Sequence, residues 1–156
     1  MPLPADGLEV VYVHLPPGGP LPEWTHRRPF NAVVVVTTAV SEDWQGLVSD
    51  WLVRSGCLYM MAWGVECSSW DDSVDYATLS LHDFKDIPPE SFVMTTWHED
   101  DPLEEAFWYA LFVGNLTYGD KLLDLTLILD IGDKERGAEL LALFDQSRDL
   151  AKRSPD

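Results

Sequence analysis

Two continuous apolar runs with an amphipathic segment between them restrict the folds open to this chain more than any other feature. Residues Ala32 to Val36 are apolar at every position, and so are residues Leu58 to Trp63. Short unbroken apolar runs are typical of parallel strands that are buried on both faces of a sheet. Between them, apolar residues recur at helical spacing from Trp44 to Leu52, and Gly56 follows as a helix terminator. The pattern predicts a β–α–β unit.

The same alternation of strand and helix continues through the rest of the chain. Helices of this length between strands imply right-handed crossovers and a mainly parallel sheet. We therefore predict one α/β domain over residues 1–156, a three-layer, Rossmann-like or flavodoxin-like open sheet of about five strands with helices on both faces. An irregular proline-rich arm at residues 16–30 interrupts this order, and the strand before it joins the sheet at an edge, in either sense. The further strand candidates are Leu8–Leu15, Phe92–Thr95 and Leu123–Ile131, and the further helix candidates are Ser69–Leu79, Leu103–Val113 and Lys134–Lys152.

The charge of the chain bears on what it can bind. With 27 acidic residues against 10 basic ones, the formal net charge is −17 at pH 7. Such a field repels polyphosphates, which argues against nucleic acid and suits a basic protein partner, a cationic ligand or a metal ion. An acidic surface also serves solubility alone. No segment has the roughly 18 uninterrupted apolar residues of a membrane helix, and no secretory signal opens the chain, so we expect a cytoplasmic protein without a membrane segment.

Two cysteines, Cys57 and Cys67, are the only thiols in the chain. An extended strand separates them, which holds them beyond the reach of a disulfide, and we expect both to be free. The spacing of cysteines and histidines matches no zinc pattern, and no glycine-rich phosphate loop is present. We therefore predict no metal and no cofactor.

Loops at the carboxyl ends of the predicted strands carry an unusual mixture of indoles, carboxylates, one imidazole and one thiol. In an open parallel sheet, ligands bind outside these strand ends. Two structural accounts compete with a binding role. Asp71 and Asp72 lie in the first turn of a predicted helix, where the helix dipole favours acids, and the indoles also suit simple loop packing. The predicted binding rim consists of Trp63, Cys67, Trp70, Asp71, Asp72, Trp97, His98 and Glu99.

Cys67 and His98 are the candidate catalytic residues, because they are the thiol and the imidazole expected on this rim. Asp71, Asp72 or Glu99 would orient the histidine, although acids beside a cysteine oppose thiolate formation. A small hydrolase or transferase that uses this pair, or a divalent metal bound by carboxylates, is therefore the alternative to a binding protein.

The segment Leu103–Val113 is apolar nearly all round. Only about half of a helix surface can face its own sheet, so at least one aromatic side chain is left to be covered. One possible cover is a second copy of the chain, in a homodimer through helix 103–113. The other is the arm, laid over the helix with Trp24 as the covering side chain, which leaves a monomer.

Three sequence motifs resemble an uncharacterised family of small bacterial proteins. They read WLVRSGCLYMMAWG at residues 51–64, CSSWDDSVD at 67–75 and FVMTTWHEDDP at 92–102, and the resemblance spans roughly residues 30–131. It implies a bacterial, stand-alone domain of unknown function, and it brings no activity, cofactor or partner. Our leading hypothesis is a non-enzymatic accessory protein, immunity-like or inhibitor-like, that presents the acidic, aromatic rim to a protein partner.

Overall fold

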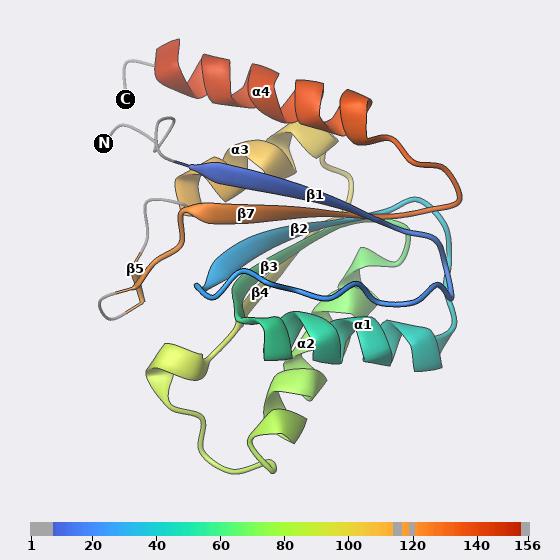
Figure 1. Cartoon of the computed structure of the whole chain (residues 1–156), viewed down its shortest axis with the longest axis vertical. Helices are drawn as coiled ribbons and strands as arrows, with labels where there is room; N and C mark the ends of the chain where they lie inside the picture. The colour runs from blue at the N-terminus through green and yellow to red at the C-terminus, as the bar shows by residue number, and fades with distance from the viewer. Residues whose placement is uncertain (1–7, 114–116, 119–120, 154–156) are drawn as a thin grey trace.

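Five strands form one fully parallel sheet in the order β1-β7-β2-β3-β4 (Figure 1). The computed structural model describes residues 8–113, 117–118 and 121–153. Two further short strands, β5 (Thr117–Tyr118) and β6 (Lys121–Leu122), pair as a separate antiparallel hairpin. The α/β class predicted from the sequence is confirmed, and the first strand is an edge strand in the parallel sense. The strands of the main sheet are β1 (Glu9–Leu15), β2 (Phe30–Val36), β3 (Cys57–Gly64), β4 (Met94–His98) and β7 (Leu125–Ile131).

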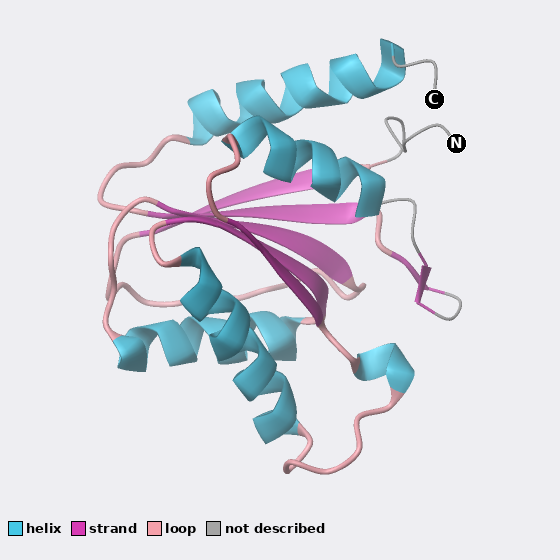
Figure 2. Cartoon of the chain, turned by 180° about the vertical axis from the view of Figure 1, so that it is seen from behind, coloured by secondary structure: helices cyan, strands magenta, loops and turns pink. Residues whose placement is uncertain are grey.

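Helices cover both faces of the sheet and give three layers (Figure 2). Helices α1 (Glu42–Ser55) and α2 (Cys67–Leu81) lie on one face, and α3 (Leu103–Val113) and α4 (Gly137–Arg153) lie on the other. A short 3₁₀ turn, η1 (Pro89–Ser91), precedes β4. Every residue of β2 and of β7 is buried, as expected for strands at the centre of a sheet covered on both faces.

Helix α1 begins and ends where the sequence predicts. The Ser41 hydroxyl accepts a hydrogen bond from the Trp44 backbone N–H, and Gly56 ends the helix in the left-handed conformation, at a φ of 107°. The chain then enters β3 directly. Local signals of capping residue, apolar stripe and terminal glycine therefore define this β–α–β unit.

The proline-rich arm crosses the α1 face of the sheet between β1 and β2 (Figure 1). Two indoles of α1 hold it, because the ring N–H of Trp44 donates to the Gly19 carbonyl and that of Trp51 donates to the Pro22 carbonyl, both at 2.9 Å. The two carbonyl groups lie outside any helix or strand, so these hydrogen bonds give them the partners that secondary structure does not supply.

Trp24 lies on the α1 side of the sheet, so the expectation that it covers helix 103–113 is wrong. Its ring packs against Phe30 at 4.8 Å and against the edge of Trp51 at 5.8 Å between centroids. The buried Phe30 and the indole of Trp51 offer it an aromatic site next to the arm. The outer side of α3 is therefore not covered by the arm.

Strand β4 begins two residues later than predicted and continues through Trp97 and His98, for which the sequence predicts a loop. The 3₁₀ turn η1 occupies the chain up to Ser91, and the pairing with β3 then starts at Met94. Because β4 is an edge strand, it tolerates polar residues such as Thr95, and the continuous-apolar pattern therefore does not define where it begins and ends.

Two helix starts also differ from the predictions. Helix α2 begins at Cys67 and not at Ser69, because Glu66 adopts a left-handed conformation that turns the chain into the helix early. Asp71 and Asp72 therefore lie beyond the first turn, and the helix dipole does not explain them. Helix α4 begins at Gly137 and not at Lys134.

Candidate functional site

The crevice where an open parallel sheet usually binds its ligand is closed by the chain itself. This crevice lies between β2 and β7, where the connections from the strands pass to opposite faces. The backbone N–H and the hydroxyl of Thr37 both donate to the Ile131 carbonyl, at 3.0 and 3.2 Å. A Cβ at Gly132 would overlap the Thr37 hydroxyl, so the two loops touch. A ligand site must therefore be sought away from the centre of the sheet.

A buried carboxylate, Asp130, forms a cluster with Tyr12 and Arg136 beside this closed crevice; we call it the Asp130 cluster. Asp130 is fully buried and accepts a hydrogen bond from the Tyr12 hydroxyl at 2.6 Å and from the Arg136 guanidinium at 2.8 Å. The Arg136 backbone N–H donates in turn to the Tyr12 oxygen. Burial, and next the hydrogen bond to Asp130, raise the pKa of Tyr12. The protein thus neutralises this acid with its own groups.

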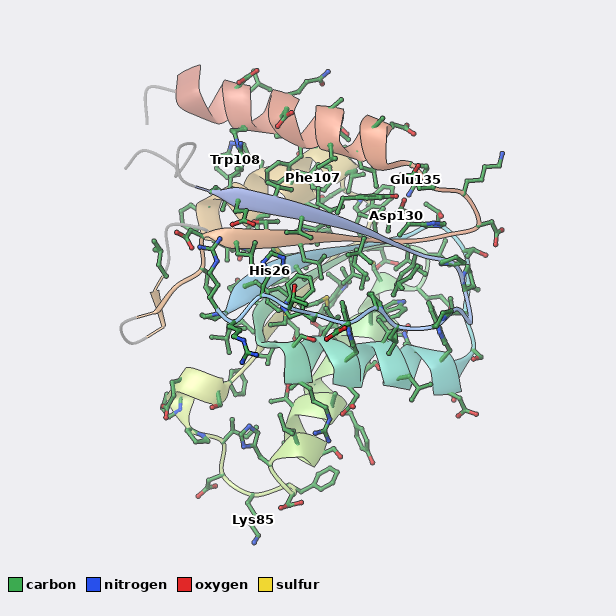
Figure 3. The ribbon with its side chains drawn as sticks, in the orientation of Figure 1. His26, Lys85, Phe107, Trp108, Asp130 and Glu135 are labelled. Atoms are coloured by element: carbon green, nitrogen blue, oxygen red, sulfur yellow. The ribbon has the colours of Figure 1, made fainter. Side chains whose placement is uncertain are left out.

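A second acidic site lies at the carboxyl end of β4 and is open to solvent. It is a hollow of about 450 Å³, which we call the β4–α3 recess. Three of its residues come from α3, where spacings of three and four residues place side chains on one face of a helix. Figure 3 shows Trp108 on this helix, well apart from Asp130 near the end of β7 and from Glu135 in the connection to α4. The recess is lined by His98, Asp101, Glu105, Trp108 and Tyr109.

The imidazole of His98 is held on three sides. Its Nε2 lies 3.1 Å from the Thr96 hydroxyl, and its Nδ1 lies 3.4 Å from an Asp101 carboxylate oxygen. The ring also meets the edge of Tyr109 at 5.5 Å, and the Tyr109 hydroxyl hydrogen-bonds that of Tyr59. These contacts fix the inner wall of the recess before any ligand arrives.

The outer wall of the recess is acidic and aromatic. Among the described residues, neither Asp101 nor Glu105 has a Lys or Arg within ion-pair distance. The indole of Trp108 is 45% exposed, and Phe112, one turn further along α3, is 43% exposed. Carboxylates beside an exposed indole form the kind of hollow that accepts a cationic side chain.

The residues of the predicted rim do not gather in one place. Trp63 is half-buried and donates its indole N–H to the Asp101 carbonyl at 2.7 Å, which positions one wall of the recess. Trp70 is buried in the cluster between the sheet and helices α1 and α2. Asp72, Trp97 and Glu99 are exposed.

Asp71 is 92% buried, since only 8% of its surface is exposed. Its Oδ1 has no hydrogen-bond partner in the part of the chain that the structure describes. The carboxylate of Asp71 also contributes to raising the pKa of Asp75, after burial of that group. Asp71 therefore belongs to the interior of α2 and not to a surface rim.

Cys67 and the imidazole of His98 lie on opposite faces of the sheet. The Cys67 side chain is part of the buried cluster on the α1–α2 face, whereas the His98 ring contacts Tyr109 of α3. Burial, and next the carboxylate of Glu99, raise the pKa of the Cys67 thiol. Cys57 is buried as well, and both cysteines are free as expected.

Of the residues that line the recess, the sequence patterns single out His98 and miss Glu105, Trp108 and Tyr109. Their spacing along α3 is visible in the sequence, and so is the absence of Lys and Arg from residues 86–113. What the sequence does not show is that α3 lies over the end of β4. Within the described residues, no cluster of three or more His, Cys, Asp or Glu side chains is arranged to hold a metal ion. In the same part of the chain, no helix is long and apolar enough to cross a membrane.

Comparisons with known proteins give one family match. A family model described as "Domain of unknown function (DUF7684)" matches residues 10–147. No curated protein matches the chain. A crystal structure described as that of "an hypothetical protein" is 13% identical, with a TM-score of 0.42, and the match covers 80% of this chain and 58% of the other. At this level of similarity it carries no argument.

Proposed function

The chain belongs to the DUF7684 family of domains of unknown function, and because that membership brings no activity, we propose a function from its own residues. We propose a non-enzymatic binding protein that holds a basic protein partner at the β4–α3 recess, in the manner of an immunity or inhibitor protein. We further propose that it works in the bacterial cytoplasm, where the free thiols Cys57 and Cys67 stay reduced.

One observation carries this proposal: the recess combines an exposed indole with two carboxylates that have no Lys or Arg partner among the described residues. An Arg or Lys side chain of a partner would form charge-assisted hydrogen bonds with Asp101 and Glu105. The same cation would lie against the ring of Trp108, a contact that contributes about 0.5–2 kcal/mol. His98 and Tyr109 are already held in place, so the inner wall needs little reordering on binding.

The surroundings of the recess favour a protein over a small molecule. Trp108 lines the recess and Phe112 lies one turn further along α3; both are exposed, and aromatic anchors dominate protein interfaces. The net charge of −17 also speeds encounters with a basic protein and repels acidic competitors.

The orientation of the Cys67 and His98 side chains supports a binding protein more than the enzymatic alternative. The Cys67 thiol and the His98 ring point to opposite faces of the sheet, and burial raises the pKa of the thiol, which disfavours the reactive thiolate. A general base must lie near hydrogen-bond reach of its nucleophile, and the side-chain hydrogen bonds of the described residues do not join these two groups.

A titration with Nα-acetyl-arginine amide tests the proposed cation site. We expect amide chemical-shift changes in ¹H–¹⁵N spectra that cluster at residues 98–109. The isosteric citrulline derivative, which lacks the charge, should leave the spectrum unchanged. The variant Glu105→Gln should lose the response. Glu104→Gln removes the same charge from the preceding residue, which does not line the recess, and should retain it.

The partner itself is tested by affinity capture with four baits, which are the wild type, Glu104→Gln, Glu105→Gln and Trp108→Ala. A basic protein retained by wild type and Glu104→Gln, and lost with Glu105→Gln and Trp108→Ala, supports the proposal. Equal capture by all four baits contradicts it. If light scattering instead shows a dimer that Trp108→Ala and Phe112→Ala dissociate, a second copy covers α3 and the proposed partner is wrong.

A further inference from the structure

Strand β4 has a free edge. It pairs with β3 on one side, and no strand in the described ranges pairs with it on the other. Its five residues therefore present backbone N–H and C=O groups that an extended chain can pair with. The opposite edge strand, β1, is seven residues long and lies away from the recess.

The side chains of β4 alternate between the two faces of the sheet. Thr96 and His98 point toward α3, since they hydrogen-bond each other and the His98 ring contacts Tyr109. Thr95 points toward α2, where its hydroxyl donates to Asp75 at 3.0 Å. Any strand added to this edge would distribute its own side chains to the same two faces.

A hollow lies at each end of β4, and the two are on opposite faces. At the carboxyl end, on the α3 face, is the β4–α3 recess. At the amino end, on the α2 face, is a smaller and mainly apolar hollow of about 230 Å³, which we call the amino-end hollow. The amino-end hollow is lined by Asp75, Thr78, Leu79, Ile87, Phe92 and Val93.

We propose that the partner binds as an extended segment that adds a strand to the free edge of β4. One apolar side chain of this segment fills the amino-end hollow, and one Arg or Lys side chain fills the β4–α3 recess. This inference rests on the proposed function, since it specifies how the basic partner reaches the recess. Strand addition is an established mode of peptide recognition, in which the backbone supplies affinity and alternate pockets supply specificity.

The negative charge around β4 favours a cationic segment as the added strand. Residues 86–113 contain seven acidic side chains and neither Lys nor Arg. A second copy of this chain pairing through its own β4 would offer Met94–His98, which brings no Arg or Lys to the recess. A segment from a basic partner satisfies the edge and the recess together.

The geometry sets the spacing of the two side chains. Side chains on opposite faces of a strand are separated by an odd number of positions. The two hollows are separated by β4, whose five residues span about 16 Å at ~3.3 Å per residue. The predicted motif therefore has an apolar residue and a basic residue five positions apart, with the order set by the direction in which the segment runs.

Synthetic peptides test the strand pairing. The probes are labelled peptides of about eight residues, rich in Thr and Val, with one Leu and one Arg, made in both orders. We expect spacing of five positions to bind at least about tenfold more tightly than spacing of four, because the even spacing puts both side chains on one face. Hydrogen exchange at the amides of residues 94–98 should slow in the complex.

Backbone N-methylation supplies a matched control. N–H groups of successive residues in a strand point alternately toward and away from the neighbouring strand. N-methylation at the positions that face β4 should weaken binding by about tenfold or more, and N-methylation at the alternate positions should have little effect.

The outcomes separate this inference from the proposed function. Binding that requires the Arg and Glu105 but is indifferent to spacing and to N-methyl position overturns strand addition and leaves the cation site in place. Strand addition is also overturned if no peptide binds at concentrations on the order of 1 mM while arginine amide still titrates the recess. Binding that survives both citrulline and Glu105→Gln overturns the proposed function itself.

Discussion

The Asp130 cluster and the β4–α3 recess lie at the same end of the sheet and differ in the source of their positive charge. Asp130 is fully buried, and the guanidinium of Arg136, six residues later, lies 2.8 Å from it. The carboxylates of Asp101 and Glu105 have no such partner within the described ranges. Asp130 is therefore paired with a cation of the chain itself, whereas Asp101 and Glu105 could accept a cation from another molecule if the proposed function holds.

The difference separates structural acids from acids that can serve binding. A carboxylate with an internal cation joins two segments, as Asp130 joins β7 to the start of α4. A carboxylate without one adds nothing comparable to the fold and keeps its affinity for an external cation. Substitutions at the two sites test whether they behave in these two ways.

The largest effect is expected from removing the internal cation. Arg136→Met leaves Asp130 buried without its cation and should lower the free energy of unfolding by about 3 kcal/mol. Arg54→Met removes an exposed pair with Asp50 and should cost less than about 0.5 kcal/mol. Urea unfolding of the two variants measures both values. If both variants lose the same unfolding free energy, the buried ion pair of Asp130 stabilises the fold no more than the exposed ion pair of Asp50.

Alkaline pH should weaken the Asp130 cluster through Tyr12. The folded-state pKa of Tyr12 lies above its ordinary value of 10.0, so the unfolded state loses this proton first. Stability is therefore full below pH 10 and falls as the pH rises above it, by at most about 1.4 kcal/mol per pH unit.

Tyr12→Phe isolates this contribution. The variant should be less stable at neutral pH, because Asp130 loses a donor, and its stability should fall less steeply above pH 10. Cys57, whose buried thiol has its pKa raised to about 12, contributes the same alkaline slope to both proteins and cancels in the comparison. Identical slopes of stability against pH for wild type and variant would show that the Asp130 cluster does not raise the pKa of Tyr12.

A lysine introduced into the recess should pair with its carboxylates and so prevent an external cation from binding there. Trp108→Lys places an ammonium three residues from Glu105 on the same helix face. Affinity for arginine amide should fall by about tenfold or more, while the free energy of unfolding changes by less than about 0.5 kcal/mol. Titration and urea unfolding on the same sample check both. Unchanged affinity would mean that the recess does not bind the cation.

The smallest effect is expected at Asp75, beside the amino-end hollow. Burial is the main cause that raises its folded-state pKa, and Asp71 and Asp72 add to it. The stabilisation of the protonated form is full below the ordinary pKa of 3.8 and is lost as the pH rises through the folded-state value. Asp75→Asn should therefore raise stability at pH 7 by less than about 1 kcal/mol, and the gain should vanish at acid pH.

The sequence predicts the centre of this molecule better than its edge. Strands β2 and β3 each contain a continuous apolar run, which is typical of a buried strand between two helical layers. The predicted start of β4 is wrong by two residues, because an edge strand mixes Thr and Trp and its start depends on the preceding 3₁₀ turn. Sequence patterns therefore predict strands reliably where both faces and both edges are buried, and less well at a strand with one free edge.

The residues of the candidate site also differ in how well the sequence predicts them. His98 is expected in the loop after the strand, and it is instead the last residue of β4. Its neighbours Glu105 and Tyr109 reach it only because α3 crosses to the face opposite α2 on its way to β7, and no local pattern encodes that crossing. Asp71 is expected in the first turn of α2, and this is wrong because Glu66 adopts a left-handed conformation and the helix begins at Cys67. A left-handed conformation is uncommon for a glutamate, so the sequence does not predict it.

The pairing of β7 between β1 and β2 has a consequence for synthesis on the ribosome. Strands β2, β3 and β4 leave the ribosome before β7, yet the apolar residues Val33–Val36 of β2 meet their second neighbour only when β7 arrives. Until then a nascent chain presents an open, apolar strand edge that invites pairing between polysome neighbours. Truncated chains that end before Leu125 would keep that edge permanently and should aggregate, so the last strand protects the molecule during its own production.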